Sequence, residues 1–154
     1  MNVNEQLIHD FYTVFQARDG EKMASFYADD AVFSDPAFGT LHGPEVGAMW
    51  RMLCGRSRDL EVTFDHVQAD DAKGSAHWEA KYTFSSSKRP VHNVIEASFI
   101  IKDGKIIEHH DHFDFWRWSR MALGPLGMFL GWTPLVQSSV RKQALSGLKA
   151  FMQK

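Results

Sequence analysis

The chain contains a single cysteine, Cys54, which excludes an internal disulfide and any metal site built from several cysteines. It also lacks a basic surplus, because 17 lysine and arginine residues face 19 aspartate and glutamate residues and give a net charge of −2. That balance favours neither nucleic acid nor an anionic membrane as a partner. The N-terminal residues lack the pattern of a signal peptide, and the longest apolar region, 121–132, is too short to cross a bilayer. We therefore expect a cytoplasmic protein that binds neither nucleic acid nor membrane.

Aromatic residues, by contrast, are abundant. The 154 residues include 12 phenylalanines and 5 tryptophans, and the aromatic content is 13%. Aromatic side chains bury large areas, and they also line pockets for flat or apolar ligands. The length suits one domain with its own core, so we treat 1–154 as a single domain.

The first part of the chain has a helical pattern. Apolar residues recur every three or four positions over 7–15, which predicts a helix that ends near residue 20. A second helix is predicted over 21–27, and a third begins at Pro44, a residue suited to a first helical turn. Between them, 31–33 is typical of a short strand, and the residues after Pro36 are expected to form a loop.

From residue 60 the apolar period changes from about 3.6 to 2, which is typical of strands. Asp103-Gly104 is a strong signal for a two-residue hairpin. The links between strands are short, so we expect an antiparallel meander. The fold class is therefore α+β, with a cone-shaped, curved antiparallel sheet wrapped around the N-terminal helices and a helical C-terminal extension over 117–154. The predicted strands cover about 60–66, 78–84, 91–101 and 105–115.

The stretch from Phe26 to Pro36, FYADDAVFSDP, resembles the opening of ketosteroid isomerases and of SnoaL-type polyketide cyclases. Both belong to the nuclear transport factor 2-like superfamily. The helix after Gly43-Pro44, the Asp103-Gly104-Lys105-Ile106 hairpin and the acidic last strand add to the resemblance, which covers about residues 5 to 116. It implies the cone-shaped fold, and it leads us to expect a homodimer.

The resemblance also implies roles for individual residues. Asp35 matches the isomerase's general base, whereas the tyrosine that holds the oxyanion falls on Phe11. The isomerase's protonated aspartate falls on Ala97, or on Glu96 without a gap, and Ala97 keeps the apolar face continuous. Steroid isomerase activity itself is therefore not expected. Asp111 resembles the acid–base aspartate of the cyclases.

A third group in the superfamily, of the limonene epoxide hydrolase type, uses an Asp-Arg-Asp trio. The only arginine between residues 59 and 115 is Arg89, which is predicted to lie at a turn. That chemistry is therefore not expected.

His109 lies in the run His109-His110-Asp111-His112 on the last predicted strand. Alternation in a strand places His109 with Asp111 on one face, and His110 with His112 on the other. Two ligands per face are too few for a closed metal site, so neither a metal nor a cofactor is expected. His109 would orient or protonate Asp111, or act as the base itself. A register slip of one residue would turn Asp111 outward.

We therefore expect a cofactor-independent acid–base enzyme, isomerase-like or cyclase-like, that moves a proton on a small apolar carbonyl compound. The alternative is a non-catalytic module of the same fold that binds a small apolar ligand or mediates dimerisation. Asp35 would then only cap its turn. From the sequence we expect the segment 121–132 to be one of three things: a lid over the pocket, a dimer contact or part of the core. The predicted catalytic residues are Asp35, Asp111 and His109, and the predicted ligand-binding residues are Phe11, Phe15, Trp50, Trp78, Tyr82, Asn93 and Phe113.

Overall fold

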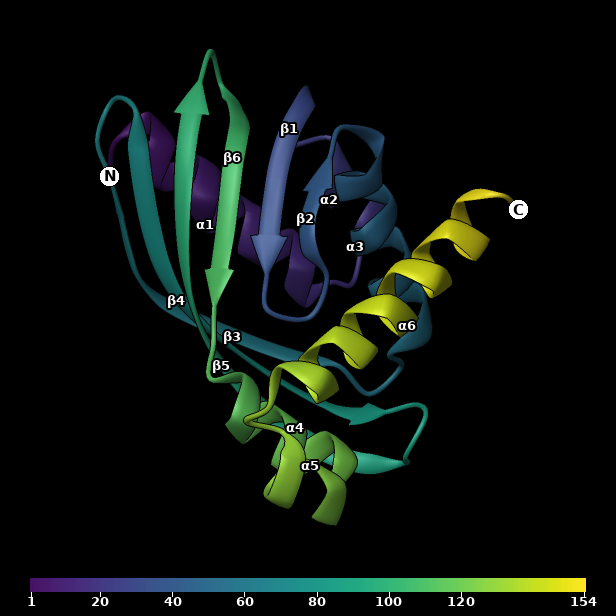
Figure 1. Ribbon diagram of the computed structural model, residues 1–154. Coiled ribbons are helices and arrows are strands. Elements are labelled where there is room, and N and C mark those ends of the chain that lie inside the picture. Colours follow the sequence, from purple (N-terminus) through teal and green to yellow (C-terminus); the bar gives the residue numbers. More distant parts are fainter.

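Six helices and six strands follow one another in the computed structural model, which describes all of residues 1–154 (Figure 1). The helices are α1 (Val3–Gln16), α2 (Gly20–Ala24), α3 (Pro44–Arg56), α4 (Phe115–Leu123), α5 (Pro125–Leu130) and α6 (Pro134–Met152). The strands are β1 (Tyr27–Asp35), β2 (Gly39–His42), β3 (Glu61–Ala69), β4 (Lys73–Phe84), β5 (Arg89–Lys102) and β6 (Lys105–His112).

The strands form one curved sheet in the order β2-β1-β6-β5-β4-β3. All neighbours are antiparallel except β1 and β6, which are parallel. Asp103 and Gly104 both have positive φ, 52° and 75°, as the predicted two-residue hairpin requires. Ala97 pairs with Asp111 across β5 and β6 and is buried, so it belongs to the apolar inner face of the sheet. The predicted α+β class with a curved sheet is confirmed.

Several elements differ from the sequence prediction. The strand predicted at 31–33 is longer, as β1 shows, β3 continues to Ala69 rather than 66, and β4 begins at Lys73 rather than 78. The second helix ends at Ala24 rather than at 27, because the chain from Tyr27 already pairs with β6. Residues 39–42, expected to be a loop, form the edge strand β2 against β1. The last strand ends at His112, and not near 115, because the Asp114 side chain accepts a hydrogen bond from the backbone N–H of Arg117 and caps α4.

The N-terminal helices cover the concave face of the sheet. The Asn2 side chain caps α1, whose Ile8, Phe11, Tyr12 and Phe15 are buried. This helix packs on β3 and β4, and α3 packs on β1 and β2. The main core of 25 buried residues lies between these helices and the sheet.

The C-terminal extension continues from the other end of the sheet. In Figure 1, α4 and α5 lie together at one end of the molecule, and α6 runs from them past α3. A second apolar cluster joins α4 and α6 to β5 through Val91, Phe115, Trp118, Ala122 and Val136. None of the helices has both the length and the hydropathy that crossing a bilayer needs.

Candidate functional site

A cavity of about 260 Å³ lies between the curved sheet and the helices α3, α4 and α6. Eighteen of its 27 lining residues are hydrophobic. Its volume is slightly below the roughly 300–1,000 Å³ usual for ligand pockets, which favours a small ligand. Asp35, from the end of β1, and Asp111, from β6, both belong to the wall. The fold therefore brings these two carboxyl groups, 76 positions apart in the sequence, to one apolar space.

Most residues predicted to contact a ligand do line this cavity. They are Phe15, Trp50, Trp78, Tyr82, Asn93 and Phe113. Phe11 is not part of the wall, because it is fully buried with its ring edge-to-face against Tyr27 and Trp50. His109 is also fully buried and lies outside the wall. Arg89 points elsewhere and donates from Nε to the carbonyl oxygen of Met121, so it does not complete an Asp-Arg-Asp trio.

Two hydrogen bonds fix Asp111 at the cavity wall. The Trp78 indole N–H donates to Oδ1 over 3.2 Å, and Nε2 of His109 donates to the same oxygen over 2.8 Å. Neither bond uses Oδ2. Asp111 is 3% exposed and His109 is completely buried, so bulk water does not compete with these bonds. The inward orientation of both residues agrees with the strand alternation, while His112 on the other face is exposed.

The hydrogen bonds of His109 continue to a tyrosine and a second tryptophan. The Trp50 indole N–H can only donate, and it donates to the Tyr27 hydroxyl oxygen over 2.8 Å. The hydroxyl proton is then directed to Nδ1 of His109, also at 2.8 Å. Nδ1 therefore accepts and Nε2 carries the proton donated to Asp111, an assignment that gives every group a partner. His109 contacts Asp111 and does not line the cavity itself.

Asp35 combines two features that the sequence presented as alternatives. Its Oδ1 accepts hydrogen bonds from the backbone N–H groups of Ala37 (2.9 Å) and Phe38 (2.6 Å), which is the turn-capping geometry. It also lines the cavity. Burial raises the pKa of Asp35 from its ordinary value of 3.8 to about 7, the Phe38 hydrogen bond opposes that rise, and the charge of Asp111 adds to it. The carboxyl group is therefore poised between its two protonation states near neutral pH.

Two polar groups on neighbouring strands are available to a ligand's oxygen. The Tyr82 hydroxyl accepts a hydrogen bond from the Trp118 indole N–H over 2.8 Å, so its own proton stays free. The side-chain amide of Asn93 makes no hydrogen bond within the protein, although only 7% of this residue is exposed. Both residues line the cavity, on β4 and β5. They are hydrogen-bond donors in a mainly apolar wall.

Sequence reasoning did not identify the contacts of Tyr27 or of the C-terminal helix. The sequence predicts Tyr27 at the end of a helix, whereas in the structure it is the first residue of β1. The side chains of Gln137 and Arg141, from α6, donate to the carbonyl oxygen of Pro36 over 3.1 and 3.4 Å. These bonds tie the Asp35 turn to the extension, across about a hundred positions of sequence. No local pattern could have indicated them.

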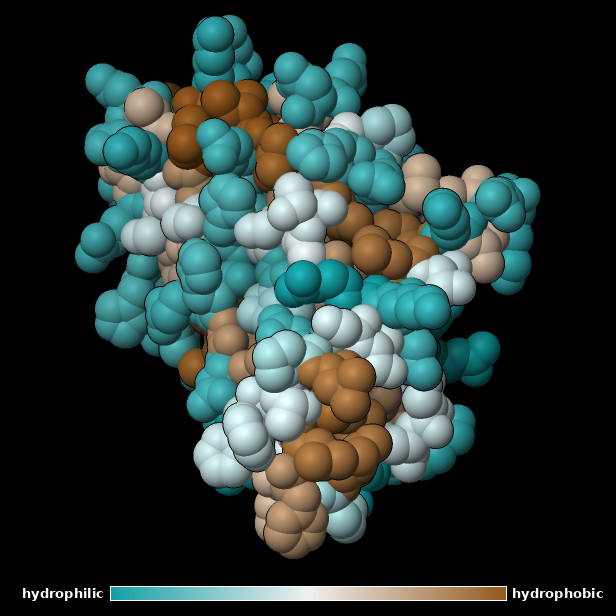
Figure 2. All heavy atoms as spheres, in the orientation of Figure 1, coloured by the Kyte–Doolittle hydropathy of each residue, from teal (hydrophilic) through white to brown (hydrophobic).

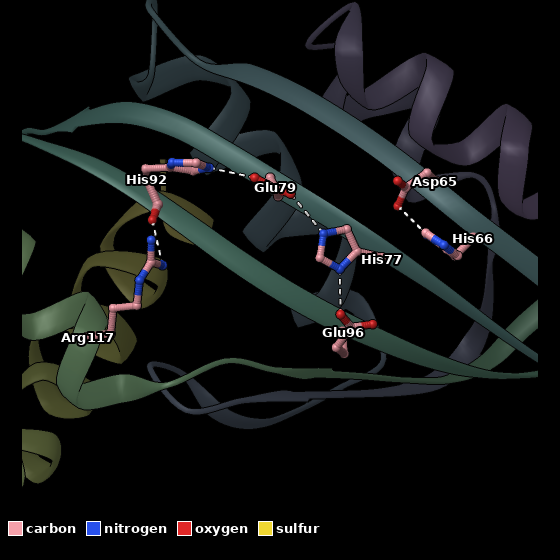
Figure 3. Close-up of polar contacts among 7 residues, drawn as sticks. All are labelled: Asp65, His66, His77, Glu79, His92, Glu96 and Arg117. Atoms are coloured by element: carbon pink, nitrogen blue, oxygen red, sulfur yellow. Dashed lines mark hydrogen bonds and ion pairs between the residues drawn. The ribbon is translucent and has the colours of Figure 1, made fainter.

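A separate polar cluster covers the outer face of the sheet, away from the cavity (Figure 3). His77 donates from Nε2 to Glu79 over 2.9 Å and from Nδ1 to Glu96. His92 donates from Nε2 to the other oxygen of Glu79 over 2.6 Å. The hydrogen bonds from His77 to Glu79 and Glu96 raise the pKa of His77, because they favour its charged form.

Comparisons with known proteins agree with this architecture. A family model described as a SnoaL-like domain matches residues 8–109. A Mycobacterium tuberculosis epoxide hydrolase of the LEH-like type is 21% identical, with a TM-score of 0.64, over 79% of this chain and 90% of its own. A putative polyketide cyclase from Xanthomonas campestris is 16% identical, with a TM-score of 0.63, over 75% and 93%.

A protein from Catenulispora acidiphila with a ketosteroid isomerase-like fold, solved with trimethylamine, is 13% identical with a TM-score of 0.67. The match covers 83% of this chain and 97% of that one. No curated protein matches the sequence. At these identities the structural likeness establishes the fold alone.

Proposed function

Because the chain belongs to the SnoaL-like family, whose nuclear transport factor 2-like fold includes isomerases, cyclases and epoxide hydrolases, we propose that it is a cofactor-independent acid–base enzyme. Its substrate is a small apolar carbonyl compound held in the cavity. The observation that carries this proposal is that Asp35 and Asp111 line one apolar cavity, with Asp35 near its pKa at neutral pH. Such a group both takes and returns protons at working pH.

In this mechanism Asp35 removes a proton from the carbon next to the carbonyl group. The negative charge that develops on the carbonyl oxygen is stabilised by hydrogen bonds from the Asn93 amide and the Tyr82 hydroxyl. Asp35 then returns this proton to a different carbon of the enolate, which gives an isomerisation. In a cyclase-like reaction the enolate carbon instead attacks a second carbonyl carbon of the substrate, and Asp35 gives the proton to the alkoxide oxygen that this attack produces. The apolar wall excludes water, which strengthens each of these polar interactions.

His109 is the positioning residue for Asp111. The chain of hydrogen bonds from Trp50 through Tyr27 holds the imidazole in one tautomer, in which the Nε2–H group donates a hydrogen bond to Asp111 Oδ1. The carboxyl group therefore cannot rotate freely, and Oδ2 remains for the ligand. This supports a role for His109 behind the carboxylate rather than as the base in contact with substrate.

The proposal is tested by hydrogen exchange into a substrate, which requires no knowledge of the physiological reaction. A panel of small apolar ketones and enones is incubated with the protein in deuterated buffer, and deuterium at the α-carbon is followed by NMR. The wild type is expected to accelerate exchange for members that fit the cavity. Asp35→Asn should lower that rate by about 10²-fold or more, the usual contribution of a general base.

Asp30→Asn is the matched control, because Asp30 lies on the same strand and is exposed. An Asp35→Asn protein that exchanges at the wild-type rate would show that the assignment is wrong.

A binding module without catalysis is the second candidate. It is favoured by one observation: Phe11, at the position of the isomerase's oxyanion-holding tyrosine, has no hydroxyl and lies outside the cavity wall. This candidate predicts that panel members bind saturably, with quenching of tryptophan fluorescence, yet show no acceleration of exchange. Measuring both binding and deuterium exchange for the same panel therefore distinguishes the two functions.

A further inference from the structure

Large apolar side chains are exposed in one region of the C-terminal extension. Of the eleven exposed large hydrophobic residues in the chain, seven fall between positions 116 and 135. Figure 2 shows hydrophobic atoms gathered over α4 and α5 at one end of the molecule. We call these residues the α5 patch: Trp116 (39% exposed), Leu126 (52%), Met128 (54%), Phe129 (70%), Leu130 (45%), Trp132 (70%) and Leu135 (78%). Large apolar side chains that gather at the surface in this way mark an interaction surface.

The patch is held in place by tight packing beneath it. Gly127 and Gly131 lie against Ser119 so closely that a Cβ at either position would fall within about 2 Å of it. The short helix α5 therefore packs on α4 through backbone, and its larger side chains point away from the protein. The indole N–H of Trp116 donates to the carbonyl oxygen of Met128 (3.2 Å), and that of Trp132 donates to Phe129 (3.0 Å). The exposed aromatic residues are thus presented by a fixed surface.

Charge is distributed very unevenly along the chain. Residues 115–154 contain six arginine and lysine residues and no aspartate or glutamate. All 19 acidic residues lie in 1–114, with the other 11 basic residues. The net charge of −2 thus conceals an extension of +6 attached to a body of −8. Within the extension, the Arg120 guanidinium lies 4.1 Å from the centre of the Trp116 ring, so positive charge adjoins the patch directly.

We propose that the α5 patch docks on the surface of an anionic lipid bilayer. Tryptophan and phenylalanine with leucine side chains insert at the boundary of headgroups and acyl chains, and nearby lysine and arginine are attracted to anionic headgroups. The absence of any acidic residue from the extension removes the repulsion that would oppose this contact. The expectation that no membrane would be a partner rested on the net charge, which hides this segregation.

A second copy of the chain fits the same surface less well. A two-fold interface places a patch against itself, so it would bring Arg120, beside Trp116, close to its own copy with no acidic residue of the extension to offset the charge. A bilayer supplies the opposite charge and an apolar layer at once. A bilayer bound at the patch would also lie next to helices that form part of the cavity wall. Trp118 and Leu123 of α4 and Val140 of α6 line the cavity. Docking therefore places the cavity next to a source of apolar molecules.

The test is sedimentation of the full chain with sucrose-loaded vesicles. One set is phosphatidylcholine alone, and the other is an equal mixture of phosphatidylcholine and phosphatidylglycerol. We expect the partition coefficient to be about tenfold or more higher for the anionic vesicles, and to fall when salt is raised. On the anionic vesicles, the double variant Phe129→Ser/Trp132→Ser should bind about tenfold or more weakly than the wild type.

Three controls make the result specific. Val3→Ser removes an equally exposed apolar side chain outside the patch (80% exposed) and should bind like the wild type. Leu135→Ser, on α6, tests the patch separately if the double variant is unstable. Light scattering reports self-association. Binding that is equal for both vesicle types, unchanged by the patch variants, or replaced by patch-dependent dimers in solution would overturn the proposal.

Discussion

The Tyr27 hydroxyl lies 2.8 Å from Nδ1 of His109, and this contact links two elements that are 82 positions apart. It joins β1 to β6, the one parallel pair in the sheet. The same oxygen accepts the Trp50 indole N–H, so one hydroxyl satisfies two buried nitrogen atoms. The position of Asp111 in the cavity therefore depends on a residue that does not line the cavity.

Tyr27→Phe should be strongly destabilising, because it leaves both the Trp50 N–H and Nδ1 of His109 buried without a partner. Each of the two unsatisfied groups costs about 1–3 kcal/mol, so the free energy of unfolding should fall by roughly 2–6 kcal/mol. Urea denaturation measures it. Tyr12→Phe is the matched control, because the Tyr12 hydroxyl is buried with no partner and its loss should be neutral or stabilising. Equal costs for the two variants would contradict the network.

The pKa of Asp35, about 7, predicts how stability depends on pH. The folded state binds this proton more tightly than the unfolded chain does, so the contribution to stability is present below pH 4 and is lost as pH rises to about 7. Asp35→Asn removes the dependence and keeps an oxygen to accept the Ala37 and Phe38 N–H groups. The variant should therefore be more stable than wild type at pH 8, by at most about 4 kcal/mol.

Unfolding measured at pH 4.0 and pH 8.0 checks this, with Asp30→Asn as the reference. A variant that is less stable than wild type at the higher pH would show that Asp35 is not held near neutrality by burial.

Arg141→Met should raise the pKa of Asp35 further. The guanidinium favours the charged carboxylate, and it also donates to the carbonyl oxygen of Pro36 in the same turn. NMR titration of the carboxyl carbon measures the change. Lys142→Met is the control, because this neighbouring cation is exposed and is not among the groups that influence Asp35. If the pKa of Asp35 is the same in both variants, Arg141 of the extension does not influence the candidate site.

The outer-face cluster should give a second, smaller pH dependence of stability with the same sign as that of Asp35. The hydrogen bonds to Glu79 and Glu96 raise the pKa of His77, so its stabilising contribution is present below the pKa of the unfolded chain and is lost as pH rises through the folded pKa. His77→Asn should flatten the stability profile above about pH 6, by no more than about 1 kcal/mol because the site is near the surface.

His66→Asn is a suitable comparison for that measurement. His66 is an exposed histidine paired with Asp65 at 2.9 Å, and its positive φ of 52° is tolerated by asparagine. If both variants flatten the profile equally, the cluster has no special role.

Local patterns were sufficient for much of the fold. The 3.6-residue period predicted α1, the Asp103-Gly104 pair predicted its hairpin, and alternation along β6 predicted that Asp111 faces inward. By contrast, β2 has only four residues and is held as a strand by its pairing with β1, so no periodic pattern in the sequence marks it. Nor does hydrophobicity say which buried aromatic faces a cavity: Phe11 and Phe15 belong to one helical stripe, yet only Phe15 lines it.

The candidate site was predictable only in part, for the same reason. Strand alternation placed Asp111 on the cavity side, whereas Asp35 was expected there only because of the resemblance to the isomerases. The partners that hold them come from distant segments, Trp50 on α3, Tyr27 on β1 and Arg141 on α6, and such contacts follow from packing rather than from local sequence. The catalytic roles, the small apolar ligand and the homodimer stay predictions.

The contribution of α6 to the cavity wall has a consequence for how such proteins diversify. The family model ends at residue 109, whereas Val140, Gln143 and Ala144 close one side of the cavity. The segment that shapes the ligand space is thus separate, along the chain, from the segment that supplies Asp35. Replacing the tail in a relative would change which molecules fit, while leaving this acid group and the sheet beneath it intact.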